Sequence, residues 1–103
     1  MEMNAVHNYY ERLVFQAIQE NYVNKLDDDT LADMACIALN KIEPRYIRYD
    51  IDMSFYMTPS ERIEVESKVA KVCEEAYQVI LKFKEHESKI AAEDIEHNHG
   101  HKG

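Results

Sequence analysis

Hydrophobic residues recur at steps of three and four along three segments of the chain, the spacing that places side chains on one face of an α-helix. The pattern predicts helices over about residues 4–25, about residues 30–42, and from residue 59 to about residue 88. Each helix has an apolar face to bury against another element. These faces comprise Val6, Tyr10, Leu13, Val14, Ala17 and Ile18, then Leu31, Met34, Ala35, Ala38, Leu39 and Ile42, and finally Val65, Val69, Val72, Ala76, Val79 and Phe83, with Ala70, Cys73, Tyr77 and Ile80 widening the last face.

Acidic residues mark the start of the second predicted helix. The run of three aspartates at residues 27–29 could bind a cation, but carboxylates just ahead of a helix more often interact with its N-terminal dipole, and we favour that interpretation. Thr30 and Asp33 are spaced as a capping box. Pro44 then ends the helix, because the residue before a proline is disfavoured in the helical conformation.

Capping signals also mark the other two helices. Asn8 and Glu11 are spaced to cap a later start of the first helix. Thr58, Pro59 and Glu61 predict a sharp start of the last helix. Proline suits the first helical position, where its missing N–H is not needed, and the glutamate can return to the threonine cap.

The segment between the second and third helices has a different pattern. Apolar and polar residues alternate strictly there, which predicts an extended segment over residues 47–55 with one buried face. A lone strand leaves its backbone groups unpaired, so we expect it either to pair with its symmetry mate in a twofold dimer or to lie as an irregular connector across the helices. The apolar positions are Ile47, Tyr49, Ile51, Met53 and Phe55, and the polar ones are Arg48, Asp50, Asp52 and Ser54.

These elements predict an all-α fold of three helices with an extended segment between the second and the third. We assign residues 1–88 to one helical domain and residues 89–103 to a disordered acidic tail that contains histidines. A core of that size is marginal, and burying the long apolar face of the last helix against a second copy would stabilise it. We therefore expect a homodimer.

The composition of the chain excludes several classes of partner and binding site. The 103 residues carry a formal net charge of -8, which disfavours nucleic acid polymers as partners. Both glycines, Gly100 and Gly103, lie at the C-terminus, so glycine-rich nucleotide loops are excluded. No apolar run is long enough to span a membrane and no signal peptide is visible, so we expect a cytoplasmic protein. Cys36 and Cys73 lie in apolar periodic segments, which predicts buried free thiols.

A basic segment stands out against the acidic background. Lys41, Arg45 and Arg48 fall within eight residues, together with Tyr46 and Tyr49. Arginine can bind phosphate through two hydrogen bonds, and tyrosine offers a face for stacking on a base, so the segment suits a small anionic nucleotide. The alternative is that the arginines pair with acidic residues of their own fold.

Other candidate chemistry is weaker. His97, His99 and His101 could close around a metal ion, but a solvated tail is the simpler interpretation, and we assign no metal site or cofactor. Asp50 and Asp52 lie on the face that the alternation assigns to solvent. A thiol on a wide apolar face is not activated as a nucleophile. We therefore expect no enzymatic activity.

Residues 38–46 (Ala-Leu-Asn-Lys-Ile-Glu-Pro-Arg-Tyr) and the continuation to residue 52 resemble the signature of the late competence protein ComFB family, an Ala-Leu-Asn-basic-Leu-Pro-Pro-x-Tyr turn. The similarity extends over about residues 8–81 and includes Asp33 and Cys36 ahead of the turn. Glu43 replaces a proline that many members have, and the clustered cysteines that bind zinc in some members are absent. Matches to the opening helix of the family are Asn8, Tyr10, Glu11, Leu13 and Val14.

The resemblance implies a small, mostly helical bacterial homodimer that regulates competence or surface appendages, with some members acting as cyclic dinucleotide receptors. We therefore expect a non-enzymatic signalling protein that binds cyclic di-GMP or cyclic di-AMP and thereby changes its affinity for a regulatory protein partner, which the sequence does not identify. The alternative is a helical adaptor without a small ligand. The expected ligand-binding residues are Lys41, Arg45, Tyr46, Arg48 and Tyr49, on a turn shaped by Asn40 and Pro44.

Overall fold

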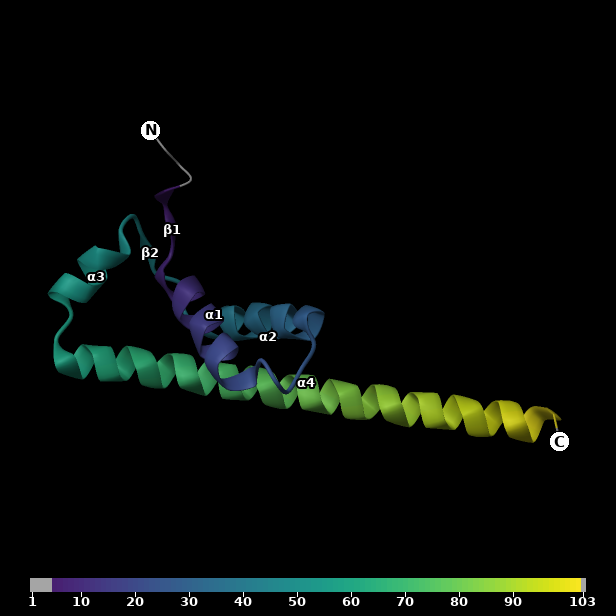
Figure 1. Cartoon of the computed structure of the whole chain (residues 1–103). Helices are drawn as coiled ribbons and strands as arrows, with labels where there is room; N and C mark the ends of the chain where they lie inside the picture. Colours follow the sequence, from purple (N-terminus) through teal and green to yellow (C-terminus); the bar gives the residue numbers. More distant parts are fainter. Residues whose placement is uncertain (1–4, 103) are drawn as a thin grey trace.

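The computed structural model describes residues 5–102, except for the side chains of residues 50, 52, 54 and 92–102. Within that part, three long helices and one short helix accompany a two-stranded antiparallel sheet, so the mostly helical fold expected from the sequence is confirmed (Figure 1). In chain order the elements are β1 (His7–Asn8), α1 (Tyr9–Tyr22), α2 (Asp28–Lys41), β2 (Tyr46–Ile47), α3 (Asp50–Tyr56) and α4 (Pro59–Lys102).

The core lies where α1, α2 and the first half of α4 pack against one another (Figure 1). Met34, Val14 and Cys73, one from each of these helices, have the largest side chains that are almost completely buried. The apolar faces expected from the sequence supply most of this core, because helical periodicity alone decides which side chains share a face. Its other buried apolar members are Tyr9, Tyr10, Ile18, Tyr22, Leu31, Ala35, Ala38, Ile42, Val69, Val72, Ala76 and Ile80.

Helix α4 is much longer than the body of the molecule. It spans 44 residues, and its C-terminal part continues beyond α1 and α2 (Figure 1). The molecule is accordingly elongated, with extents of 69 × 34 × 22 Å. The division into a domain of residues 1–88 and a disordered tail of residues 89–103 stays a prediction, since most side chains of the tail lie outside the described part of the chain.

Short polar contacts set the helix starts. The Asn8 side chain accepts a hydrogen bond from the N–H of Tyr10, so the later start of α1 is confirmed. Helix α2 begins before the expected capping box, because the Asp27 carboxylate accepts from the N–H of Thr30 at 2.8 Å. At the start of α4, the N–H of Glu61 donates to the Thr58 hydroxyl, as expected from the sequence.

The prediction of an extended segment over residues 47–55 is wrong for most of its length. Only Ile47 belongs to a strand, where it pairs with His7, and the chain then forms helix α3. The strand β1 is two residues long and offers no further partners, whereas a short helix pairs some of its backbone groups within the segment itself. The short helix also replaces the three-helix scheme with one of four helices in the described residues.

The prediction of a buried thiol is wrong for Cys36 and correct for Cys73. Cys36 is exposed, and neither cysteine forms a disulfide. It lies two residues from both Met34 and Ala38, about 200° around the helix from each, and therefore on the opposite face of α2 from the core. Cys73 lies in the first half of α4 and is only 1% exposed.

None of the helices in the described part of the chain combines the length and the apolar character needed to cross a membrane.

Candidate functional site

The turn after α2 is held against the start of α1 by the buried side chain of Asn8. Its Oδ1 atom accepts hydrogen bonds from the backbone N–H of Tyr10 at 3.2 Å and of Arg45 at 3.0 Å. The backbone N–H of Tyr9 donates to the Arg45 carbonyl oxygen at 2.7 Å. The antiparallel pairing of Asn8 with Tyr46 continues this contact. The backbone of the basic segment is thus fixed, although 37 residues separate Asn8 from Arg45.

The turn and α4 enclose an open groove of about 520 Å³, which we call the basic groove. Lys41 and Arg45 line it from the turn, and Lys68 and Lys71 line it from α4. Two carboxylates, of Glu43 and Glu75, also lie along it. Four cations against two anions make this groove locally positive in a chain whose formal net charge is -8.

A smaller pocket of about 290 Å³, which we call the α3 pocket, adjoins the basic groove and shares Tyr10, Arg45 and Lys68 with it. Its remaining walls come from α3 with the residue after it and from the first turns of α4. These walls are apolar and acidic: Met53, Tyr56, Met57, Glu61, Glu64 and Val65. The two pockets therefore meet at these three residues, and one of them is basic while the other is mixed in character.

The cations of the basic groove have no partner for their side chains within the described part of the chain. Among the side chains that the structure describes, no carboxylate forms an ion pair with Lys41, Arg45, Lys68 or Lys71. Arg45 uses its backbone for the contacts with α1, and its side chain is exposed. A bound anion can therefore interact with these groups without first breaking an internal salt bridge.

Three of the expected ligand-binding residues lie outside both pockets. Tyr46 is 68% exposed and Tyr49 is 52% exposed. The Cζ atom of Arg48 lies 5.2 Å from the centre of the Tyr49 ring, so these two side chains stack on each other at the surface. The structure brings together Lys41 and Arg45 from the expected set and leaves the role of the other three as a prediction.

The expected turn residues have modest local contacts. The Asn40 amide donates to the carbonyl oxygen of Cys36 at 2.9 Å, within α2, and Pro44 lies in the loop between α2 and β2. The side chain that reaches the turn is that of Asn8. Lys68 and Lys71 were not among the predicted site residues, because nothing in the charged pattern of α4 indicates which of its cations face the turn.

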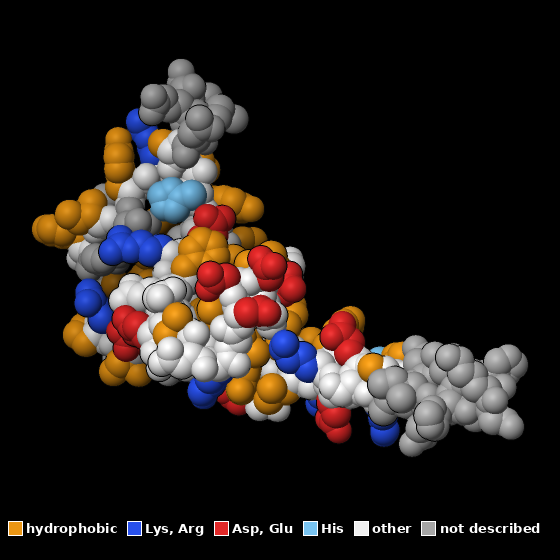
Figure 2. Space-filling view, turned by 45° about the vertical axis from the view of Figure 1, so that its right-hand side comes forward, with side chains coloured by type: hydrophobic (Ala, Val, Ile, Leu, Met, Phe, Trp, Pro, Cys, Tyr) orange, Lys and Arg blue, Asp and Glu red, His pale blue; other side chains and the backbone are white. Residues whose placement is uncertain are grey.

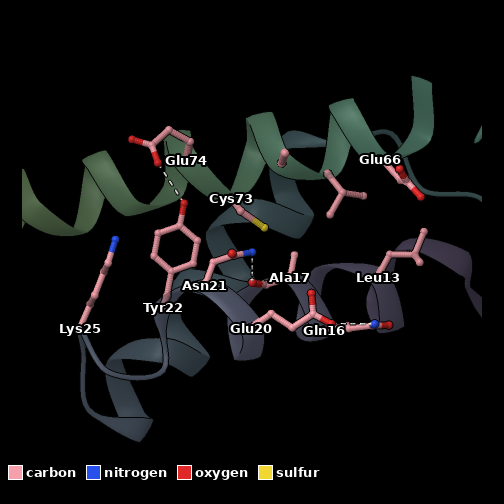
Figure 3. Close-up of a pocket in the computed structure, with 12 residues that line it drawn as sticks. Leu13, Gln16, Ala17, Glu20, Asn21, Tyr22, Lys25, Glu66, Cys73 and Glu74 are labelled. Atoms are coloured by element: carbon pink, nitrogen blue, oxygen red, sulfur yellow. Dashed lines mark hydrogen bonds between the residues drawn. The ribbon is translucent and has the colours of Figure 1, made fainter. Parts of the chain in front are cut away.

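A second groove, of about 770 Å³, lies between α1 and α4 and contains none of the expected site residues (Figure 3). The Cys73 sulfur points into it, and the Tyr22 hydroxyl donates to the Glu74 carboxylate at 2.9 Å across it. The ring centres of Tyr22 and Tyr77 lie 4.9 Å apart, and the Lys25 ammonium lies over both rings. One hydrogen bond and one ring contact thus join α1 to α4 beside this groove.

The pKa values of the groups in this second groove indicate a structural role and not a catalytic one. Burial and the hydrogen bond to Glu74 raise the pKa of Tyr22 to about 12. Hydrogen bonds from Gln78 and Tyr22 lower the pKa of Glu74, and burial raises the pKa of the Cys73 thiol. Near neutral pH the tyrosine remains a donor, the glutamate an acceptor and the thiol protonated, so none of these groups is ready to exchange a proton or attack a substrate.

No group of three or more His, Cys, Asp or Glu side chains in the described part of the chain is placed to hold a metal ion. The candidate histidines His97, His99 and His101 lie outside the described side chains, so the interpretation of that segment as a solvated tail stays a prediction.

Comparison with known proteins supports the resemblance seen in the sequence. The family model described as late competence development protein ComFB matches residues 7–84, about three quarters of the chain, including the basic turn, β1, α1 and α2. No curated protein and no solved structure gives a significant match. The chain therefore belongs to the ComFB family of late competence development proteins.

Proposed function

We propose that this ComFB-family protein is a competence-related regulator that binds a cyclic dinucleotide in the basic groove. Membership of the family implies the regulatory role. The observation that carries the binding proposal is the convergence of Lys41, Arg45, Lys68 and Lys71 on one groove of an acidic chain.

The chemistry of the groove suits a small dianion. A cyclic dinucleotide carries two phosphates in one compact ring, and four cationic side chains from opposite walls can contact both. Arginine binds phosphate through two parallel hydrogen bonds, while lysine acts as a mobile point charge. Glu43 and Glu75 limit the total positive charge, which disfavours a long polyanion that needs an extended basic face.

The rigid attachment of the turn adds to this argument. Arg45 is held through both its backbone N–H and its carbonyl oxygen, so the base of its side chain has a fixed position before any ligand arrives. Binding then needs to order only the side chain and not the loop, which lowers the entropic cost of association.

A regulatory output requires that the ligand prefer one state of the protein. Tight binding alone shifts no equilibrium. We propose that the ligand changes the affinity for a regulatory protein partner, in a cytoplasmic homodimer. Exposed apolar residues on α4, such as Val79 and Phe83, are available for the contact between copies. Sedimentation velocity at micromolar concentration tests the dimer, and a monomer only would exclude it.

Isothermal titration calorimetry of the full chain with cyclic di-GMP and with cyclic di-AMP tests the ligand proposal. We expect heat of binding at physiological salt and weaker binding as sodium chloride is raised, because phosphate contacts are screened. Linear pGpG at the same concentration serves as a control for general attraction of anions. Absence of heat with both cyclic dinucleotides would overturn the proposal.

One observation favours a second candidate, a helical adaptor without a small ligand. Ile51 is 66% exposed and Phe55 is 81% exposed on α3, and hydrophobic side chains project from the left edge of the molecule in Figure 2, the side on which Figure 1 places α3. Ile51 and Phe55 lie one helical turn apart, and exposed apolar side chains that gather on one helix face suit a contact with another protein. An adaptor of this kind binds its partner equally well with and without cyclic dinucleotide, which a pull-down in both conditions distinguishes.

A further inference from the structure

The α3 pocket adjoins the basic groove and differs from it in chemistry. Arg45 and Lys68 stand at the junction of the two compartments. Beyond them the walls are apolar, aromatic and acidic, and Figure 1 shows α3 set apart from α1 and α2, near the start of α4. A ligand whose phosphates lie at the junction can therefore reach a less basic compartment with another part of its structure.

The aromatic wall of this compartment is Tyr56, which is 82% exposed on the last turn of α3. Met53 and Met57 lie beside it in the pocket, and both are partly buried. A purine that enters between these groups can stack on the tyrosine ring and contact the thioethers. A pocket of about 290 Å³ is large enough for one purine base.

The acidic wall contains one carboxylate in use and one that is free. Glu61 accepts a hydrogen bond from the Thr58 hydroxyl at 3.2 Å as part of the helix cap. Among the described residues no hydrogen bond or ion pair engages Glu64. Its carboxylate lines the pocket one helical turn after Glu61, and it has two acceptor oxygens and no donor.

Guanine and adenine present opposite edges to such a group. The Watson–Crick edge of guanine offers two adjacent donors, N1–H and the N2 amino group, which fit the two oxygens of one carboxylate. Adenine offers one donor and the N1 lone pair, which a carboxylate repels. A site built to pair with a group on the ligand discriminates strongly against the analogue that lacks it.

We propose that the α3 pocket is a guanine subsite in which Glu64 binds the Watson–Crick edge and Tyr56 stacks on the base. This inference rests on the proposed cyclic dinucleotide function and makes the ligand a guanine nucleotide. Glu64 is the residue that sets base specificity, whereas Arg45 and Lys68 hold the phosphate next to it.

Calorimetric titration of the full chain with cyclic di-GMP and cyclic di-AMP tests the subsite. We expect the wild-type protein to prefer cyclic di-GMP by about ten- to a hundredfold, the discrimination typical of one bidentate base contact. Glu64→Gln places an amide donor against the guanine donors, so the affinity for cyclic di-GMP should fall by about tenfold or more. The same variant should keep or improve its affinity for cyclic di-AMP.

Glu66→Gln is the matched control, because Glu66 is exposed on the same helix and lines the other groove. It should leave both affinities unchanged. Tyr56→Ala should weaken both ligands and Tyr56→Phe should restore them, with circular dichroism to confirm folding. A wild-type preference for cyclic di-AMP, or a Glu64→Gln effect that is nil or equal for both ligands, would overturn the subsite while leaving the proposed function intact. Binding of neither ligand by the wild type would overturn both.

Discussion

The Oδ1 atom of Asn8 accepts a hydrogen bond from the backbone N–H of Arg45 at 3.0 Å. The same atom caps the first turn of α1 by accepting a hydrogen bond from the N–H of Tyr10. One buried side chain thereby joins the start of the first long helix to the basic turn that follows the second. Because both donors are backbone groups, the link fixes the path of the chain and leaves the arginine side chain free. This joint connects the stability of the fold with the geometry of the basic groove.

Replacing Asn8 should therefore affect both stability and binding. Asn8→Ala removes the cap and leaves two backbone N–H groups without a partner, so we expect a loss of about 1–3 kcal/mol in the free energy of unfolding. Asn8→Asp keeps the acceptor oxygen and should lose less. Urea denaturation followed by circular dichroism measures the free energy of unfolding of both variants. Asn21→Ala is the control, because that exposed side chain bonds only within α1, and an equal loss there would exclude a special role for Asn8.

Arg45→Ala tests the phosphate contact at the junction of the two pockets. Loss of one charge-assisted hydrogen bond should cost about 1.5–3 kcal/mol of binding free energy, or roughly tenfold or more in the dissociation constant for a cyclic dinucleotide. Arg62→Ala removes the same charge from an exposed position of α4 outside both pockets. Equal dissociation constants for the two variants would show that binding depends on the net charge of the protein and not on the groove.

The role of α4 in the groove is testable through Lys71. Lys71→Glu should weaken cyclic dinucleotide binding strongly at low salt and less at high salt, because the lysine acts through its charge and salt screens that interaction. Lys82→Glu makes the same change in charge at an exposed position farther along α4. We expect its titration curve to match that of the wild type, and a similar loss in both variants would argue for long-range electrostatics.

The Tyr22–Glu74 contact predicts a specific response to alkaline pH. The pKa of Tyr22 is raised from 10.0 to about 12 in the folded protein. Between these values the unfolded chain loses a proton that the folded chain keeps, so the stabilisation is complete below pH 10 and declines as the pH rises towards 12. Thermal melts from pH 8 to 12 should show a smaller decline in melting temperature for Tyr22→Phe than for the wild type. Equal declines in the two proteins would refute the assignment of this pH dependence to Tyr22.

The two thiols should differ in reactivity. Cys36 is exposed and Cys73 is buried with a raised pKa, so an aromatic disulfide reagent at neutral pH should label only Cys36 in the native protein. Both should react in denaturant. Mass spectrometry of the labelled peptides identifies the site, and fast native labelling of Cys73 would indicate that α1 and α4 separate readily.

Local sequence signals were sufficient for the parts of the fold that depend on neighbouring residues. The start of α4 at Thr58 and Pro59 and the cap at Asn8 follow from short-range rules of hydrogen bonding. The alternation before α4 was misleading, because period two indicates a strand only when a partner strand is present. The pairing with β1 ends at Ile47, and the chain becomes helical from Asp50.

From the sequence alone came the apolar faces of the three long helices, the basic segment at Lys41 and Arg45, and the resemblance to the ComFB family, since each of these depends on residues close together along the chain. The folded chain was needed to show that Asn8 fixes the turn and that Lys68 and Lys71 complete the groove. Those partners lie far apart in sequence, and only the packing of α1 and α2 on α4 decides which charged positions of a long helix face the same space.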